Sequence, residues 1–237
     1  MTDIHSHILF DVDDGAKSIE ESIEILKKMY DIGFRNVICT PHYIEDSSYC
    51  VDNKEKLEKF NLLKSELKKQ NIDINLCLGN EIFINKNIHE LIESNNIYTL
   101  NNTNYILVEF PFHNQILNVE DIIHELSIKG YTTVIAHPER YSYFQDNYAE
   151  VDRLRKEGFL FQGNYASILG HYNKKSQKLL KYMLKKGYID FLATDIHRIH
   201  RTYTIDNFDK IEKSIIKITK KDYYEKIKNN SDLICKV

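Results

Sequence analysis

Short apolar runs alternate with amphipathic segments along the chain, and this alternation limits the possible folds more than any other feature. Seven runs rich in Val, Ile, Leu and Phe have the length of strands. They cover residues 2–7, 36–41, 74–80, 105–110, 132–137, 159–163 and 189–194. Continuous apolar runs are typical of parallel strands that are buried on both faces. The sequence therefore predicts an α/β protein with a parallel sheet.

Helical spacing fills the gaps between the seven runs. The first predicted helix begins at Ser18, where Glu21 completes a capping box, and Gly33 marks its expected end. Further predicted helices cover residues 52–70, 86–94, 118–129, 148–157, 173–186 and 205–219. Because no linker interrupts the alternation, we expect residues 1–237 to form one domain, a closed or nearly closed barrel. An open doubly wound sheet is the alternative.

The charge balance and the apolar runs indicate which partners to expect. The chain has 32 Lys or Arg and 35 Asp or Glu among 237 residues, a net charge of −3, whereas a general nucleic-acid binder needs a basic surplus. No apolar run approaches the roughly 18 residues of a membrane span. We therefore expect no nucleic-acid partner, no stable membrane insertion and a cytoplasmic location. Cys39 and Cys77 lie in predicted strands and are expected to be buried free thiols.

Histidine and carboxylate side chains stand at the ends of nearly all these runs. His5 and His7 alternate along the first run, so both point to the same side of a strand. The other candidates, one of them in the loop after the first run, are Asp14, His42, Glu81, Glu109, His137, Asp195 and His197. The sixth run offers only Gln162 and Asn164. Since the carboxyl ends of parallel strands converge on one mouth, these side chains are expected in one pocket.

Five histidines and four carboxylates in one pocket predict a metal site. Nine nitrogen and oxygen ligands exceed the needs of one ion, so we expect two or three divalent ions bridged by carboxylates. The absence of cysteine ligands favours Mn, Fe or Zn over a thiolate-rich structural zinc site. Each residue alone could be an ordinary core histidine or a paired carboxylate. The repetition of the pattern at successive strand ends favours metal-dependent hydrolysis.

Arginine residues near the last ligands are candidates for contacts to a phosphate group. Arg140 follows His137 by three residues, and a guanidinium group binds phosphate oxygens bidentately. The alternative for Arg140 is a salt bridge, for instance with Glu139. Arg201 is the second candidate, and Arg198 competes with it for this role. The chain has no cysteine-phosphatase spacing, no Walker-type loop and no GxSxG motif.

Seven segments, within a resemblance that runs from residue 3 to about 201, resemble the motifs of the polymerase-and-histidinol-phosphatase (PHP) superfamily. They are Asp3-Ile4-His5-Ser6-His7 with Asp13-Asp14-Gly15, Thr40-Pro41-His42, Gly79-Asn80-Glu81, Glu109-Phe110-Pro111, Ala136-His137-Pro138-Glu139-Arg140-Tyr141 and Asp195-Ile196-His197. Within this superfamily the chain resembles the bacterial manganese-dependent tyrosine-protein phosphatases of the CpsB/YwqE type. The resemblance implies a single PHP phosphoesterase domain with a distorted (β/α)7 TIM-like barrel and a trinuclear metal site.

The same resemblance implies an activity and a partner. The nine residues above would bind the metal ions, most simply Mn²⁺, with Fe or Zn as alternatives, and Arg140 and a later arginine would contact phosphate. A hydroxide activated by the ions would attack phosphotyrosine, with Asp195 or a neighbouring histidine as a proton donor. The expected substrate is the C-terminal tail of a bacterial tyrosine kinase that controls capsule or exopolysaccharide synthesis. The alternatives are a small-molecule phosphoesterase, such as a histidinol-phosphate phosphatase, and an inactive metal-binding partner domain.

Overall fold

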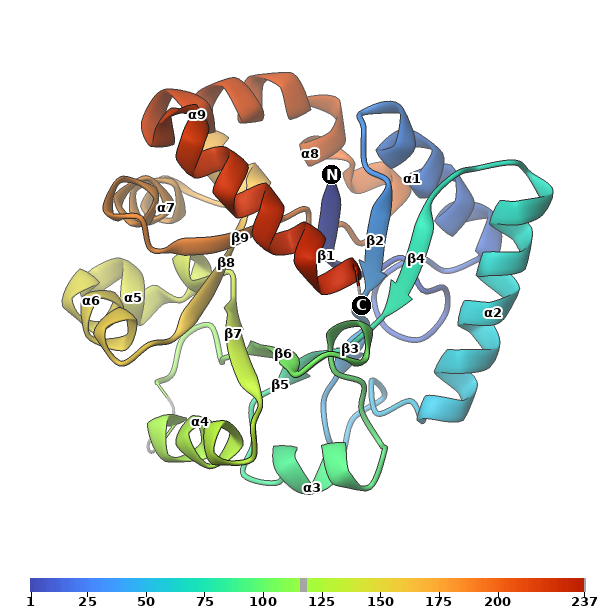
Figure 1. Ribbon diagram of the computed structural model, residues 1–237, viewed down its shortest axis with the longest axis horizontal. Coiled ribbons are helices and arrows are strands. Elements are labelled where there is room, and N and C mark those ends of the chain that lie inside the picture. Colours follow the sequence, from blue (N-terminus) through green and yellow to red (C-terminus); the bar gives the residue numbers. More distant parts are fainter. Residues whose placement is uncertain (116–118, 237) are drawn as a thin grey trace.

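A mixed α/β fold with two parallel sheets emerges from the computed structural model, which describes residues 1–115 and 119–236 (Figure 1). The smaller sheet has the strand order β1 (Thr2–Ser6), β2 (Asn36–Cys39) and β4 (Asn75–Leu78). The larger sheet has the order β3 (His42–Tyr43), β5 (Glu81–Phe83), β6 (Tyr105–Glu109), β7 (Thr132–Ala136), β8 (Leu160–Asn164) and β9 (Ile189–Ala193). All neighbouring strands are parallel, which confirms the predicted α/β class.

The second and third predicted strands, 36–41 and 74–80, each end two residues earlier in the structure, and each is followed by a short strand, β3 or β5, that was not predicted. Thr40 and Pro41 separate β2 from β3, and Pro41 has no N–H to continue a ladder. Gly79 and Asn80 separate β4 from β5. The chain passes from the smaller sheet to the larger sheet at these breaks. The other five predicted strands agree with the structure to within one residue at each end.

Helices surround the sheets and largely follow the predicted segments (Figure 1). The helices that match predictions are α1 (Ile19–Asp31), α2 (Asn53–Lys69), α3 (Ile88–Glu93), α4 (Val119–Ile128), α6 (Tyr148–Lys156) and α7 (Lys174–Lys186). The predicted start of α4 at residue 118 lies outside the described residues. The Ser18 side chain accepts a hydrogen bond from the Glu21 N–H, as the capping box requires, but the Glu21 carboxylate accepts from the Lys17 N–H instead of Ser18.

The last part of the chain is more helical than the sequence indicated. Short helices α5 (Ser142–Asp146) and α8 (Tyr203–Asp206) were not predicted separately. Helix α9 (Phe208–Cys235) has a kink at Lys220, where φ is 61° and ψ is 167°, so its first part ends where the prediction ended and a second helical part, which was not predicted, follows. The extension buries Tyr224, Ile227 and Ile234 at helical spacing, which the many lysines and asparagines between them conceal in the sequence.

Apolar side chains from both sheets meet in one inner cluster. This cluster contains Ile4, Ile38, Cys77, Leu100, Leu107, Val134, Ala136, Phe191, Ala193 and Ile234. Strands β1 and β9 are joined near their ends by a single parallel bridge between Ser6 and Ile196. The hydrogen-bonded strand order in the described residues is that of two sheets, so a closed barrel is not detected. A larger apolar cluster packs the helices against the outer faces of the strands.

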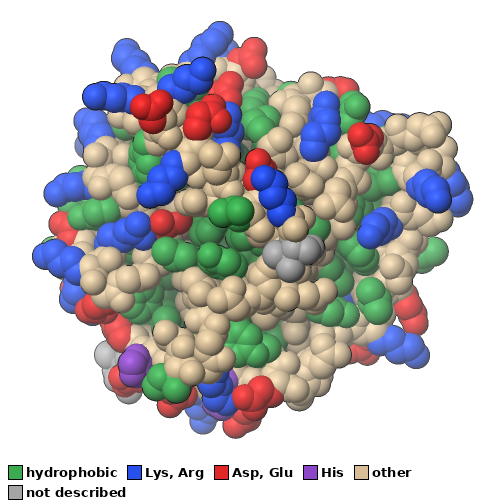
Figure 2. Space-filling model, viewed as in Figure 1, with side chains coloured by type: hydrophobic (Ala, Val, Ile, Leu, Met, Phe, Trp, Pro, Cys, Tyr) green, Lys and Arg blue, Asp and Glu red, His purple; other side chains and the backbone are tan. Residues whose placement is uncertain are grey.

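The molecular surface carries mixed charge. Basic and acidic side chains are interspersed on the face shown in Figure 2, with hydrophobic side chains scattered among them. This face therefore offers no continuous basic surface for a nucleic-acid backbone. Among residues 1–115 and 119–236, no helix combines the length and apolar character needed to cross a membrane.

Candidate metal centre

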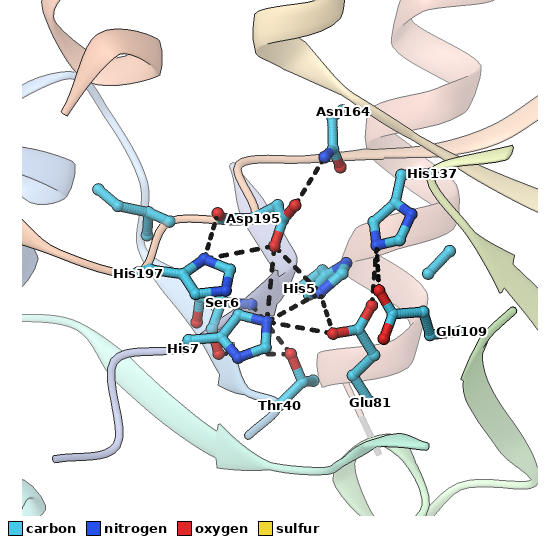
Figure 3. A network of polar contacts seen from close by, with 12 residues as sticks. His5, Ser6, His7, Thr40, Glu81, Glu109, His137, Asn164, Asp195 and His197 are labelled. Atoms are coloured by element: carbon cyan, nitrogen blue, oxygen red, sulfur yellow. Dashed lines mark hydrogen bonds and ion pairs between the residues drawn. The ribbon is translucent and has the colours of Figure 1, made fainter. Parts of the chain in front are cut away.

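The nine predicted ligands converge in one cluster, in which seven lie near the carboxyl ends of strands or in the loop after β1, whereas His42 and Glu81 are the first residues of β3 and β5. Most of them point toward a common centre in Figure 3. They form four overlapping groups in which the ligand atoms lie within 4.8 Å of one another. The groups are His7, Asp14, His42 and His197; His5, His7 and Glu81; His5, His137 and Asp195; and His42, Glu81 and Glu109. Residues from six strands and one loop are thus brought together.

Glu81 occupies the middle of this cluster and is fully buried. Its Oε2 atom lies 3.0 Å from His42 Nδ1, 3.2 Å from His5 Nε2 and 3.3 Å from His7 Nε2. Its Oε1 atom lies 2.9 Å from His137 Nε2. Burial alone would raise the pKa of Glu81, but His5 and His42 lower it well below its usual range. Glu81 is therefore a carboxylate that four imidazole rings approach at once.

Several atoms of the cluster lack the partners that buried polar atoms normally have. Of the buried side-chain atoms that make no hydrogen bond in the described part of the chain, four belong to the cluster, although charge contacts reach some of them: Asp14 Oδ1, His42 Nδ1, Glu81 Oε2 and His137 Nδ1. An unsatisfied buried polar atom costs about 1–3 kcal/mol, so four in one place need an explanation. Burial and the charge of Glu81 also raise the pKa of Glu109 to about 8. Divalent cations would satisfy these donor atoms and relieve the carboxylate repulsion, so the residues fit metal ions.

Two ligands have a backbone conformation that residues other than glycine rarely adopt. His137 follows β7 with φ 31°, and Asp195 follows β9 with φ 52°. Such left-handed residues cost about 1–3 kcal/mol each and occur where the surrounding structure holds them. The Asp195 N–H donates to the His5 carbonyl at 3.0 Å, which ties the end of β9 to β1. The strain therefore lies at the two strand ends that turn ligands into the cluster.

Asp13 orients His7, which directly follows the first strand, a role that the sequence analysis missed. His7 Nδ1 donates to Asp13 Oδ2 at 2.7 Å, so the His7 Nε2 atom is left to face Glu81. Asp13 also accepts hydrogen bonds from the N–H groups of His42 and Gly15. A Cβ atom at Gly15 would lie 2.0 Å from the His7 carbonyl oxygen, so only glycine fits there. The only indication of this role in the sequence was the Asp13-Asp14-Gly15 segment, which follows His7 closely.

The uncharged strand β8 contributes a chain of amides that the sequence analysis also left without a role. His5 Nδ1 donates to Gln162 Oε1 at 2.8 Å, and Gln162 Nε2 donates to Asn164 Oδ1 at 2.8 Å. Asn164 Nδ2 then donates to Asp195 Oδ2 at 2.7 Å. The two amides are two residues apart on one strand, so they share a face. They fix the orientation of one histidine ligand and one carboxylate ligand.

Asp195 divides its two oxygen atoms between different partners. Oδ2 accepts from Arg140 Nη1 and from Asn164 Nδ2, each at 2.7 Å. Oδ1 faces the imidazoles of His5 and His7 at 3.4 and 3.5 Å. Burial alone would raise the pKa of Asp195, but His5, with His7, His197 and Arg140, lowers it well below its usual range. A lowered pKa favours the carboxylate form of Asp195, the form that holds a cation.

Arg140 is held in place by two aromatic rings. Its guanidinium carbon lies 4.7 Å from the centre of the Phe112 ring and 4.5 Å from that of Tyr172. Its salt bridge is with Asp195 at 2.7 Å, not with Glu139. Glu139 instead accepts from the Asn164 N–H and the Ser167 hydroxyl, while its burial raises its pKa to about 7. Arg140 thus presents a fixed guanidinium plane beside the ligands.

A cavity of about 360 Å³ opens beside the ligand cluster. It is lined by Asp14, Arg140, Ala166, His171, Tyr172, Thr194, Asp195, Ile196, His197, Arg201, Tyr203 and Thr204. His171 and Tyr203 form a stacked pair in this lining, with ring centres 4.1 Å apart. Arg201 is exposed and lines the cavity, whereas Arg198 Nε donates to Glu21 at 2.8 Å. The cavity places two arginines and aromatic rings beside the candidate metal site.

Comparisons with known proteins agree with this architecture. CapC of Staphylococcus aureus is 36% identical over 199 residues, which is 84% of this chain and 78% of that protein. Tyrosine-protein phosphatase YwqE of Bacillus subtilis is 32% identical over 199 residues, with the same shares of the two chains. A solved structure from work on YwqE and on Streptococcus pneumoniae CpsB, named there metal-dependent tyrosine phosphatases, matches with a TM-score of 0.88 and 28% identity.

That match covers 99% of this chain and 94% of the solved one, so the likeness extends over the whole fold. The sequence profile of the family described as "Capsular polysaccharide synthesis, CpsB/CapC" matches residues 1–235. The match includes every candidate ligand and both arginines of the cavity. The chain therefore belongs to the CpsB/CapC family.

Proposed function

We propose that this protein is a metal-dependent protein-tyrosine phosphatase, a phosphoric monoester hydrolase. The observation that carries the proposal is the placement of nine nitrogen and oxygen ligands next to a cavity that two arginines line. This combination suits hydrolysis of a phosphate ester, because cations and guanidinium groups both neutralise phosphoryl oxygens. The names of the relatives YwqE and CpsB support the same activity.

The metal ligands that we propose are His5, His7, Asp14, His42, Glu81, Glu109, His137, Asp195 and His197. Two or three divalent ions would be shared among the four overlapping groups, and Mn²⁺ is our first choice, with Fe or Zn as alternatives. Such ions supply Lewis-acid activation of water and neutralise charge on the phosphate. Metal analysis of the purified protein tests the number and the identity of the ions.

The protein's own residues would orient the substrate and the ligands. Asp13 and Gln162 hold the Nδ1 atoms of His7 and His5, so the Nε2 atoms of both rings face the cluster centre. Arg140 uses one N–H group on Asp195, and its remaining donors are available to phosphoryl oxygens. Arg201, which also lines the cavity, is the second phosphate contact that we propose.

The cavity lining favours an aromatic phosphate ester. The rings of Tyr172, His171 and Tyr203 offer flat surfaces against which a phenyl ring can pack. The leaving phenol has a pKa of about 10, so its departure needs little help from an acid. This agrees with the lowered pKa of Asp195. The catalytic role that we propose for Asp195 is to bind metal and to hold Arg140 in place.

Turnover of two substrates distinguishes the proposal from its alternatives. We expect the metal-loaded protein to hydrolyse a phosphotyrosyl peptide with a higher kcat/KM than histidinol phosphate. The reverse preference would assign the protein to small-molecule phosphoesterases. Hydrolysis of neither substrate, with metal bound, would favour an inactive partner domain.

The partner that we propose is the phosphotyrosine-containing C-terminal tail of a bacterial tyrosine kinase in capsule or exopolysaccharide synthesis. The description of the family, which concerns capsular polysaccharide synthesis, supports this partner. The reaction would take place in the cytoplasm, where a kinase that uses ATP phosphorylates its tail. Dephosphorylation of a purified kinase tail, followed by mass spectrometry, tests the proposal directly.

We also propose that residues 1–237 form one PHP domain with a distorted (β/α)7 barrel. Inner side chains from β1, β4 and β9 share one cluster, and the Ser6–Ile196 bridge joins the first and last strands. Both observations support a barrel in which β2 with β3, and β4 with β5, act as single strands. We expect calorimetry to show one cooperative unfolding transition, whereas two independent transitions would indicate two domains.

A further inference from the structure

Two cysteine thiols face each other where helix α9 meets the smaller sheet. Cys77 lies on β4 within the inner apolar cluster and is 5% exposed. Cys235 is the last residue of α9 and is partly exposed. The two Sγ atoms are 3.7 Å apart, although 158 positions separate the residues in the sequence. In Figure 1 the end of α9 lies close to β2 and β4.

The backbone around Cys235 is fixed, so this approach of the thiols is built into the fold. Ile234 is buried in the inner cluster, and its carbonyl accepts a hydrogen bond from Asn101 Nδ2 at 2.9 Å. Asp232 accepts from the Thr2 hydroxyl at the start of β1. A disulfide has an S–S distance of about 2.05 Å, so the sulfur atoms need to approach by only about 1.6 Å. Side-chain rotation can supply most of that movement.

Neither of the other two cysteines, Cys39 and Cys50, is placed to form a disulfide with Cys77 or Cys235. Cys39 lies on the neighbouring strand β2, but it is fully buried in the larger apolar cluster, on the opposite face from Cys77. Cys50 lies in a loop, where its Sγ is 3.4 Å from the Tyr43 hydroxyl. Cys77 and Cys235 are thus a specific pair with one accessible and one buried sulfur.

We propose that Cys77 and Cys235 form a redox modification site that reacts with low-molecular-weight disulfides and closes to an intramolecular disulfide. The Cys235 thiolate attacks one sulfur of the small disulfide, forms a mixed disulfide and releases one small thiol, which takes the proton from Cys235. The Cys77 sulfur then attacks Cys235 Sγ, the mixed bond breaks, and the second small thiol leaves with the Cys77 proton. Two protein thiols are oxidised and one small disulfide is reduced.

The cross-link would fasten the last turn of α9 to β4. Closing so long a loop restricts the unfolded chain, so the disulfide stabilises the folded protein. We expect the disulfide to raise the Tm by roughly 5–10 °C for a chain of this size. The pair lies away from the ligand cluster, so hydrolysis at low temperature should not change.

The test uses metal-loaded, full-length protein and oxidised glutathione. After incubation, the free thiols are alkylated under denaturing conditions, and the peptides are identified by mass spectrometry. We expect a cross-linked peptide pair that contains residues 77 and 235, with Cys39 alkylated in full. Dithiothreitol should reverse both the cross-link and the rise in Tm.

Single variants control for the pairing. Cys235→Ser should leave Cys77 as a free thiol, because Cys77 is too buried to react with glutathione itself. Cys50→Ser is the matched control and should cross-link like the parent protein. The proposal would be overturned if both thiols stayed fully alkylated, or if Cys235 stopped at the glutathione adduct. A cross-link that left the Tm unchanged would overturn the proposed attachment of α9.

Discussion

Lys56 should make the protein more stable as the pH rises, and replacing it should remove this effect. Its side chain is 1% exposed, and its ammonium group donates to Asn80 Oδ1 at 3.0 Å between the rings of Tyr43 and Tyr98. Its hydrogen-bond acceptors, Asn80 Oδ1 and the Asn96 carbonyl at 3.5 Å, are both uncharged. Burial lowers the pKa of Lys56 from 10.5 to about 7. The folded protein therefore tolerates the charged lysine poorly.

The sign and size of the effect follow from proton linkage. Between pH 7 and 10.5 the unfolded chain holds a proton on Lys56 that the folded chain has released, so the free energy of unfolding rises with pH in this window. A fall in pKa from 10.5 to about 7 corresponds to about 5 kcal/mol at most, since one pH unit is worth about 1.36 kcal/mol. About 2 kcal/mol of this should appear between pH 7 and 9.

The assay compares Lys56→Met with the parent protein by urea unfolding at pH 6, 7.5 and 9, in EDTA so that metal binding adds no pH dependence. We expect the variant to be more stable by about 2–4 kcal/mol at pH 6, because Asn80 Oδ1 keeps its bond from the Tyr98 N–H, and this gain should shrink toward pH 9. Lys54→Met, at an exposed position of the same helix, is the control. A gain that did not vary with pH would refute the lowered pKa.

Three further predictions concern the candidate site. Chelation should abolish hydrolysis of an aryl phosphate, and Mn²⁺ should restore it; activity that survives exhaustive chelation would exclude metal dependence. Asn164→Ala should weaken metal affinity or turnover by about 10–100-fold, as measured by metal titration and kcat, and unchanged values would show that Asp195 needs no orientation. Arg140→Ala should lower kcat/KM by about 100-fold and Arg201→Ala by about 10-fold, while Arg198→Ala, whose side chain binds Glu21, should resemble the parent; a larger loss at Arg198 would reverse the assignment.

The ligand cluster could be anticipated from the sequence because strand ends in a parallel fold converge regardless of detail. His5, Glu81 and Asp195 could be predicted as ligands because each lies within or just after an apolar run that has the length of a strand. The residues that orient them lacked such a signal. Gln162 and Asn164 are ordinary amides on a strand, and only the folded structure shows that they connect His5 to Asp195.

The errors in the fold have equally local causes. A run of apolar residues indicates a strand, but it does not show that Pro41 interrupts the ladder and sends the chain into a second sheet. The second half of α9 has buried positions at Tyr224, Ile227 and Ile234, yet its lysines and asparagines dilute the helical pattern. Its packing against the inner cluster depends on residues more than 100 positions away, beyond the reach of any window of sequence.

The metal centre and the stability of the fold are coupled through residues that are strained or crowded. His137 and Asp195 have left-handed backbones, and the raised pKa of Glu109 reflects its burial and the repulsion of Glu81. Between pH 4.5 and about 8 the folded chain holds a proton on Glu109 that the unfolded chain has released, so without metal the stability falls as the pH rises. Cations that bind only the folded cluster oppose this loss, by about 2.7 kcal/mol at a concentration one hundred times Kd. The same carboxylates that make the site suitable for metal therefore make the fold depend on it.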